Sequence, residues 1–506
     1  MQKSCVMKSV GFGAVILTLS GFVCKLLGAF FRVPLVNLLG VDGVGVFQLV
    51  MSIYAFALVL VSGGTTSALS KLVSRARANG KNAEIESYLK IALLWALGLG
   101  FVVGVLFALL SKALVSMQGV GNFENFLLFA LLLPFGAVLA VFRGYFQGFG
   151  NMLPTAISQV IEQAVKFTAG LLFAMLFEKH FSGFGVFGAL FGITISEFIS
   201  VIFLLICFLK KNCEKCGKVD NFSKKFCEYG KISWFLTISA LVVPCVNAFD
   251  SLVLISRLEL SGLDKETSLS LFGLQSGVCG TLLNFPLVFS VAVASAMLPN
   301  VTVLVEKSAV NGQIIAKYLK ILMFFVLPAT FGLVAISKSL IPILFSDLSE
   351  KFVETAFWLL LFGGFATVLT AFMHFLFVLL QAYNEFRFIS LISVVGGAVK
   401  MCITFFLSSV WAVNIFAVVF GNFALTFLVV IFSLFRLKQH ISFEIPYSEI
   451  FPVLFGTLLM FLVAFLFVQQ NPFSNVINVL VATILGGLTY LVFSSFAFVK
   501  FFKQKN

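Results

Sequence analysis

Long runs of apolar residues follow one another along the whole chain, broken by short polar segments. A helix that crosses a bilayer core about 30 Å thick needs roughly 20 consecutive apolar residues. Windows of that length predict fourteen transmembrane helices in the 506 residues. They lie near 10–31, 44–63, 88–110, 124–146, 153–177, 185–209, 232–257, 272–297, 316–340, 355–380, 387–408, 411–435, 448–468 and 475–499.

Composition agrees with this pattern. Hydrophobic residues make up 60% of the chain, charged residues only 11%, and the mean hydropathy is +1.10. A water-soluble protein could not bury that much apolar surface, because even large domains leave much of their surface in water. We therefore predict an all-α polytopic membrane protein with about fourteen transmembrane helices.

The basic residues set the predicted orientation. With the N-terminus in the cytoplasm, the inside segments hold 24 of the 34 Lys and Arg, the outside loops hold seven, and the spans hold three. The positive-inside rule favours this arrangement, and an odd number of spans would lose it. We expect a bacterial plasma-membrane protein with both termini in the cytoplasm. No cleavable signal peptide is expected, because the first apolar run is long enough to span.

The longest and most basic loop divides the predicted chain into parts. We expect an N-lobe over 1–210 with helices 1–6, a basic cytoplasmic linker over 211–231, a C-lobe over 232–436 with helices 7–12, and two further helices with a tail over 437–506. Cys213 and Cys216 in the linker form one CxxC pair, which is weak evidence for zinc without a second pair. We interpret them as reduced thiols, and no metal is expected.

Six ionisable residues fall inside predicted spans, and each is costly there unless it faces a partner, water or the bundle interior. They are Lys25, Glu162, Lys166, Glu197, Asp250 and Lys400. On the fifth span, Gln159, Glu162, Gln163 and Lys166 share one helical face at spacings of three and four. This stripe either lines a cavity, or Glu162 and Lys166 form an i,i+4 pair that joins helices.

Three other spans carry the remaining charges. On the first, Lys25 and Arg32 are seven positions apart and point the same way, with Arg32 at the outer end. On the seventh, Asn247, Asp250 and Arg257 share a face, and Asp250 could either pair with Arg257 or hold a coupling cation or a proton. The lone Glu197 of the sixth span is interpreted as a packing residue.

A weak repeat connects the fifth and eleventh spans. A shift of 234 residues places the segment from Arg143 to Lys166 on the one that ends at Lys400, with five identities in twenty compared positions. Both segments begin with a predicted cytoplasmic turn and carry Lys near mid-depth. Six spans separate them, so we predict parallel six-helix repeats that form two pseudo-symmetric lobes.

Several motifs resemble a known family. They are "KLLGAFFRVPLVNLLGVDGVGVFQLVMSIY", "SALSKLVSRARANGK", "RGYFQGFGNMLPTAISQVIEQAVK" and "NAFDSLVLISRL". These segments are similar to the oligosaccharidyl-lipid/polysaccharide flippases of the MOP superfamily, nearest to the stage V sporulation protein B type and related to the MurJ lipid II flippases. On the first helix Lys25 and Gly28 keep the MurJ spacing, but Arg32 comes one residue late and Val33 replaces an acid, which fits the sporulation type.

The resemblance implies a MATE-like fold and a transport function. It implies a polyprenyl-diphosphate-linked saccharide, such as a lipid II-like cell-wall or polysaccharide precursor, moved to the outer leaflet by alternating access. Lys25, Arg32, Lys166 and Lys400, with the polar residues of the fifth span, are then candidates for holding the diphosphate. Na⁺ or H⁺ at Asp250 and Asn247, or the membrane potential, could drive transport; no other cofactor is expected. The bilayer and cell-envelope synthesis enzymes are candidate partners, and nucleic acid is not.

Two other classes compete with this interpretation. A multidrug or cation antiporter of the same superfamily would have acids dominating its cavity and usually twelve spans. A membrane glycan polymerase or transferase would need an acidic or His-bearing loop for acid–base chemistry. The three His, at 180, 374 and 440, are isolated, so we do not expect an enzyme.

Overall fold

The computed structural model of the protein describes residues 2–119, 121–210, 222–306, 312–346, 348–441, 447–470 and 473–503. Within these ranges all regular elements are helices, which confirms the predicted all-α class. Cys213 and Cys216 lie outside the described residues. The chain divides into two compact units, Met1–Gly273 and Leu274–Asn506, each described by itself below. The lobe and linker boundaries expected from the sequence stay a prediction.

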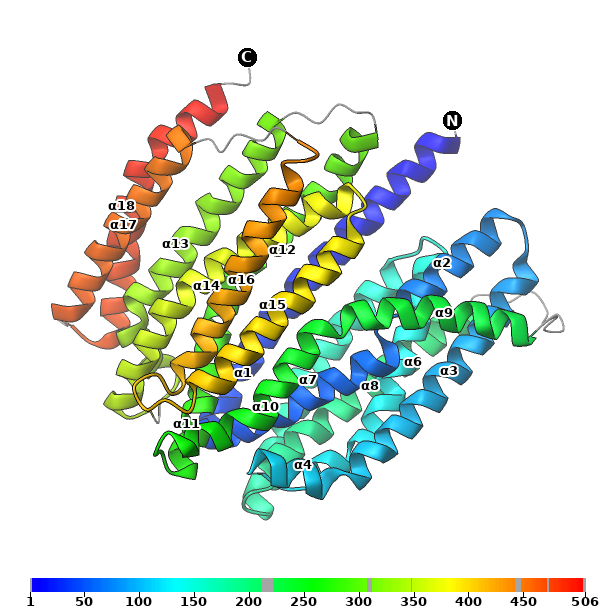
Figure 1. The fold of residues 1–506 in the computed structure, drawn as a ribbon, viewed down its shortest axis with the longest axis horizontal. Coiled ribbons are helices and arrows are strands. Elements are labelled where there is room, and N and C mark those ends of the chain that lie inside the picture. Colours follow the sequence, from blue (N-terminus) through cyan, green and yellow to red (C-terminus); the bar gives the residue numbers. More distant parts are fainter. Residues whose placement is uncertain are drawn as a thin grey trace. The chain divides into compact units, whose positions relative to one another are not determined.

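The first unit holds eleven helices in the described ranges (Figure 1). They are α1 (Gln2–Ser62), α2 (Thr65–Ala78), α3 (Asn82–Leu109), α4 (Ser111–Gln118), α5 (Glu124–Leu127), α6 (Phe129–Gly148), α7 (Leu153–His180), α8 (Gly185–Lys210), α9 (Phe222–Ala240), α10 (Val242–Leu260) and α11 (Lys265–Gly273). The most extensive packing in this unit joins α7 to α8.

The second unit begins with a π-helical turn, η1 (Leu274–Cys279). Its described α-helices are α12 (Gly280–Glu306), α13 (Gly312–Leu344), α14 (Glu350–Ala382), α15 (Phe386–Leu407), α16 (Phe416–Leu437), α17 (Tyr447–Gln470) and α18 (Asn475–Lys503). Figure 1 shows α17 and α18 as an orange and red pair beside α13, and both contact that helix. Leu327, Val453, Met460 and Tyr490 form a buried cluster where the three meet.

Twelve helices of the described chain are long and apolar enough to cross a membrane, or thirteen if the bent pair α9 and α10 counts as one span. Each of the fourteen predicted segments falls largely on helical residues, but the first two lie in α1, and the seventh, 232–257, is divided between α9 and α10, which meet at a bend of 55°. α1 consists of two helices joined by a kink at Gly40, so the two parts correspond to two successive spans. The predicted separation of the first two spans is confirmed, but the first helix continues past residue 31 and the break comes at Gly40, where φ is 70°.

Small residues allow α7 and α8 to approach closely. A Cβ added to Gly192 of α8 would lie 2.5 Å from Cα of Gly170 on α7, so neither position has room for a side chain. Such small-residue contacts are a usual way for transmembrane helices to associate. Gly170 continues the polar stripe predicted on this helix, but it is packed against α8.

The turn that leaves α6 recurs after α14, 234 residues later. In the first, the amides of Gly150 and Asn151 donate to the carbonyl oxygens of Gln147 and Phe146. In the second, Asn384 and Glu385 donate to Gln381 and Leu380. Gly150 and Asn384 both have left-handed backbones, with φ of 74° and 61°. The matching hydrogen bonds support the repeat predicted from the sequence.

Candidate functional site

The four polar residues predicted to share a face of α7 lie among α1, α6 and α8. Gln159, Glu162, Gln163 and Lys166 are all half-buried. α7 packs extensively on α8 and α1, and more lightly on α6. The stripe is therefore placed where its side chains can contact three other helices of the same unit.

Glu162 has a partner that the sequence did not indicate. Arg143 of α6 donates from Nη2 to Oε2 of Glu162 over 2.6 Å, and from Nε to Oγ of Ser158 over 3.1 Å. The two charged side chains are 16% and 21% exposed. The expected pairing of Glu162 with Lys166 is not found, and Arg143, expected in the turn, lies inside α6. α7 packs beside α6, and this brings Arg143 within hydrogen-bond distance of Glu162 although 19 positions separate the two residues.

Lys166 lies instead against an aromatic ring of α1. Its Nζ is 5.5 Å from the centre of the Phe31 ring, within reach of a cation–π contact. Arg32, the next residue of α1, is close enough for its charge to repel that of Lys166. Neither cation forms an ion pair with any part of the chain that the structure describes. Two like charges thus lie close together, and the acids Glu162 and Glu197 attract Lys166 without forming an ion pair with it.

The two glutamines of the stripe face α1. Ser20 donates to Oε1 of Gln159 over 3.2 Å. A Cβ added to Gly28 would lie 3.9 Å from Oε1 of Gln163, so Gly28 leaves room for this amide. Lys25, by contrast, is exposed and has no hydrogen bond or ion pair with the described residues. The structure thus brings the stripe together with Arg32, and does not join Lys25 to it.

A second buried acid adjoins this cluster. Glu197 of α8 is only 5% exposed, and Tyr54 of α1 donates its hydroxyl to Oε1. Its Oε2 has no hydrogen-bond partner among the described residues. Sequence reasoning interpreted this acid as a packing residue and did not identify Tyr54. No local spacing could have done so, because 143 positions separate the two residues.

The other predicted site residues lie elsewhere. On α10, Asp250 is buried and Asn247 is exposed, so the two do not share an environment. Lys400 of α15, in the second unit, is 5% exposed. A Cβ added to Gly421 of α16 would lie 3.2 Å from its Cγ, so its stem packs between these helices. Convergence of Lys25, Lys166 and Lys400 on one ligand stays a prediction.

The cluster suits the binding of an anion. Around α7 it holds three cations, Arg32, Arg143 and Lys166, and two acids, Glu162 and Glu197. One cation is already bound to Glu162, whereas Lys166 and Arg32 are unpaired within the described chain. An anion placed beside them would relieve their repulsion and replace lost hydration. No covalent chemistry follows from this geometry.

A model of the polysaccharide biosynthesis protein family matches residues 10–305, which is more than half of the chain. The protein belongs to this family. Among curated proteins, Stage V sporulation protein B of Bacillus subtilis (strain 168) is 26% identical over 297 residues, covering 57% of this chain and 57% of that relative. The match thus spans little more than half of the relative's length. Lipid II flippase MurJ of the same organism is 22% identical over 519 residues, covering 95% of this chain and 94% of its own.

Solved structures of similar fold include transporters of the MOP superfamily. Lipid II flippase MurJ in an inward closed conformation has a TM-score of 0.73 at 14% identity, covering 96% of this chain and all of that one. An inward-facing multidrug resistance MATE transporter of the MOP superfamily has a TM-score of 0.67 at 13% identity, covering 85% and 98%. The resemblance drawn from the motifs and the MATE-like fold are thereby confirmed.

Proposed function

We propose that this protein is a flippase that moves a polyprenyl-diphosphate-linked saccharide from the inner to the outer leaflet by alternating access. The observation that carries the proposal is the pair Arg32 and Lys166, two neighbouring cations of membrane helices that form no ion pair in the described chain, although Glu162 and Glu197 lie near enough to attract Lys166. Intramembrane charges of this kind usually mark a substrate pathway. A diphosphate is the complementary ligand, because it brings about two negative charges that cannot cross hydrocarbon bare.

The relatives support the substrate class. The family model describes polysaccharide biosynthesis proteins, and the relative whose match covers most of this chain is a lipid II flippase. Transport requires no covalent step, in keeping with a non-enzymatic role. The expected partners are the lipid-linked saccharide, the bilayer and cell-envelope synthesis enzymes, in a plasma membrane with both termini cytoplasmic. An inside-negative potential would assist outward movement of the anion by about 2.3 kcal/mol per charge per 100 mV. Asp250, which is buried on α10, is the proposed coupling site for Na⁺ or H⁺, without Asn247.

A second candidate is a multidrug or cation antiporter of the same superfamily. The observation that favours it is Glu197, a buried acid with one oxygen unpartnered in the described structure. A deprotonated acid at this depth would attract a cation, and MATE transporters share the fold. In this alternative Glu197, rather than Lys166, would contact the substrate.

The two candidates can be separated in proteoliposomes. A fluorescent polyprenyl-diphosphate sugar would be added to one leaflet, and its arrival in the other measured with a membrane-impermeant quencher. We compare the wild type, R32Q/K166Q, and the matched control K179Q/R387Q, whose two residues are exposed. Loss of two charge-assisted contacts is expected to slow flipping at least about tenfold, while the control behaves as the wild type.

Two outcomes would contradict the flippase proposal. One is a wild type that leaves the labelled lipid in its original leaflet while the same vesicles exchange ethidium for protons. The other is an R32Q/K166Q variant that flips as fast as the control. If the wild type exchanges ethidium for protons without flipping the lipid, and E197Q abolishes that exchange, the antiporter is supported.

A further inference from the structure

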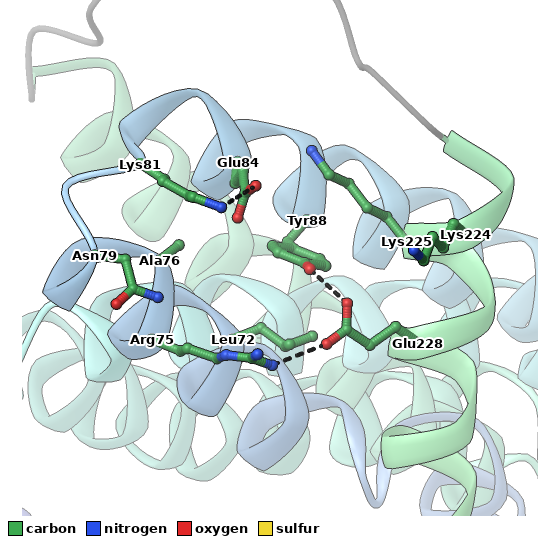
Figure 2. Close-up of a pocket in the computed structure, with 10 residues that line it drawn as sticks. All are labelled: Leu72, Arg75, Ala76, Asn79, Lys81, Glu84, Tyr88, Lys224, Lys225 and Glu228. Atoms are coloured by element: carbon green, nitrogen blue, oxygen red, sulfur yellow. Dashed lines mark hydrogen bonds and ion pairs between the residues drawn. The ribbon is translucent and has the colours of Figure 1, made fainter.

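A polar cavity of about 260 Å³ lies in the first unit, where the ends of α2, α3 and α9 meet (Figure 2). We call it the basic pocket. It is lined by Leu72, Arg75, Ala76, Asn79, Lys81, Glu84, Tyr88, Lys224, Lys225 and Glu228. It is smaller than the roughly 300–1,000 Å³ of sites for drug-sized ligands. The charge asymmetry of the sequence predicts that this end of the three helices faces the cytoplasm.

Cations outnumber acids in the basic pocket. Four of its lining residues are basic and two are acidic, which leaves two positive charges without a counter-charge inside it. Arg75 pairs with Glu228 over 3.1 Å, and Lys81 with Glu84 over 3.4 Å. The excess therefore lies on the two remaining cations, Lys224 and Lys225, which come from the first turn of α9.

Neither of these two lysines has an acidic partner among the residues that the structure describes. Lys225 places its Nζ 5.8 Å from the centre of the Tyr88 ring. Lys224 is exposed and makes no hydrogen bond there. Figure 2 shows one long lysine side chain reaching from α9 toward Glu84 and Tyr88. The side chains that carry the excess charge thus border the cavity.

The ion pairs already present in the basic pocket do not prevent its side chains from binding another anion. The side chains of Arg75 and Lys81 are 69% and 60% exposed, so their pairs with Glu228 and Glu84 are weak and easily exchanged. Tyr88 donates to Glu228 over 2.7 Å and holds this acid on the α3 side. The first turn of α3 has no side-chain cap, which leaves backbone N–H groups at the cavity edge.

We propose that the basic pocket binds a phosphate group, held by Lys224 and Lys225 with Arg75 and Lys81 turning toward it. Two uncompensated positive charges attract an anionic phosphate group, and three helices supply donors around a cavity of suitable size. The phosphate could belong to a lipid headgroup at the membrane surface or to a soluble phosphate ester, since both present the same group. This site is separate from the cluster around α7 and does not rest on the proposed transport function.

The chain contains a natural reporter for this site. The rings of Phe226 and Tyr229 on α9 lie 5.3 and 6.1 Å from the Trp95 ring of α3. A ligand that draws Lys224 and Lys225 inward should therefore change Trp95 fluorescence. The other three Trp, at 234, 358 and 411, would be replaced by Phe in the full-length protein so that only this signal remains.

The test compares K224Q/K225Q with a matched control, K71Q/K231Q. Lys71 and Lys231 lie on α2 and α9, are exposed, and do not line the pocket, so both variants lose the same charge. One arm titrates inorganic pyrophosphate. The other compares nanodiscs of phosphatidylcholine with nanodiscs containing phosphatidylglycerol. Circular dichroism verifies that each variant is folded.

We expect the apparent affinity for one probe to fall at least about tenfold in K224Q/K225Q and to stay unchanged in the control. A difference with pyrophosphate identifies a soluble phosphate compound as the source. A difference only with phosphatidylglycerol identifies a lipid headgroup. If neither arm distinguishes K224Q/K225Q from K71Q/K231Q, the pocket does not bind phosphate and the proposal is overturned.

Discussion

Arg143 of α6 and Glu162 of α7 form an ion pair over 2.6 Å inside the first unit, although 19 residues separate them. Because both side chains are largely buried, each neutralises a charge that the other would leave uncompensated. We expect R143Q or E162Q alone to lower the free energy of unfolding by about 2–3 kcal/mol. The double variant R143Q/E162Q should lose less than the sum of the two.

This prediction is measured by a double-mutant cycle in micelles titrated with SDS. A coupling energy of about 1–3 kcal/mol is expected. The cycle K179Q with E162Q serves as control, since Lys179 is exposed and lies in the last turn of α7, far from Glu162. Additive effects of R143Q and E162Q would show that the pair does not stabilise the fold.

Tyr54 and Glu197 give a second prediction. Removing the hydroxyl in Y54F leaves the buried carboxyl of Glu197 without the donor to its Oε1. Stability should fall by about 1.5–3 kcal/mol. E197Q removes the acid and should cost less, about 1 kcal/mol or below.

Thermal unfolding followed by circular dichroism compares these variants. Y383F is the matched control, because the Tyr383 ring stacks on His440 and its hydroxyl makes no hydrogen bond with the described chain. A Y54F protein as stable as Y383F would contradict the role of the hydrogen bond.

The repeated turn predicts how its left-handed residues respond to substitution. Gly150 has φ of 74°, and an L side chain there costs about 1–2 kcal/mol. G150A should therefore destabilise by roughly 1 kcal/mol. N384G, which relieves the same geometry in the second unit, should be neutral or slightly stabilising.

Unfolding midpoints of these variants are compared with G98A. Gly98 lies in α3 with nothing within 4 Å of an added Cβ, so Ala is accommodated and is the better helix former. A G150A protein as stable as G98A would mean that the turn tolerates a side chain at this position.

Glu385 predicts a pH dependence at the end of the second turn. The hydrogen bond from Arg436, 2.8 Å long, holds the pKa of this carboxyl below its ordinary value of 4.5. A carboxyl whose pKa is lower in the folded state stabilises the fold above the unfolded pKa. That contribution is lost as the pH falls through the lower, folded pKa.

We therefore expect the stability of the wild type to fall more steeply below pH 4.5 than that of E385Q. Unfolding midpoints measured from neutral to acidic pH test this. E354Q removes an exposed acid of α14 and should keep the slope of the wild type. Parallel curves for E385Q and E354Q would disprove the contribution of Glu385.

The fold was largely predictable from the sequence, because transmembrane helices follow from runs of apolar residues. The polar face of α7 was also predictable, since helical periodicity places Glu162 and Lys166 on one side. The partners of the acids Glu162 and Glu197 were not predictable. Glu162 binds Arg143 and Glu197 binds Tyr54, and such contacts depend on which helices pack together, which no local pattern encodes.

The exact position of the break between the first two spans was not predictable, for a different reason. A polar break around Arg32 and Pro34 indicates a loop on a hydropathy scale, but a helix can continue past both residues. The chain bends only at Gly40, where the backbone leaves the helical region. Hydropathy reports the environment of side chains, whereas the course of the helix depends on backbone dihedral angles.

The recurring turns show that the two halves kept one backbone and changed their chemistry. Applied to the ion pair, the shift of 234 residues that superposes the turns places Phe377 where Arg143 stands and Gly396 where Glu162 stands. Both charges were exchanged together, as expected for partners that are each costly alone. The lysine of the repeat stayed in both copies. The ion pair behind the first turn therefore has an uncharged counterpart behind the second, so the two turns carry the same backbone on different side-chain chemistry.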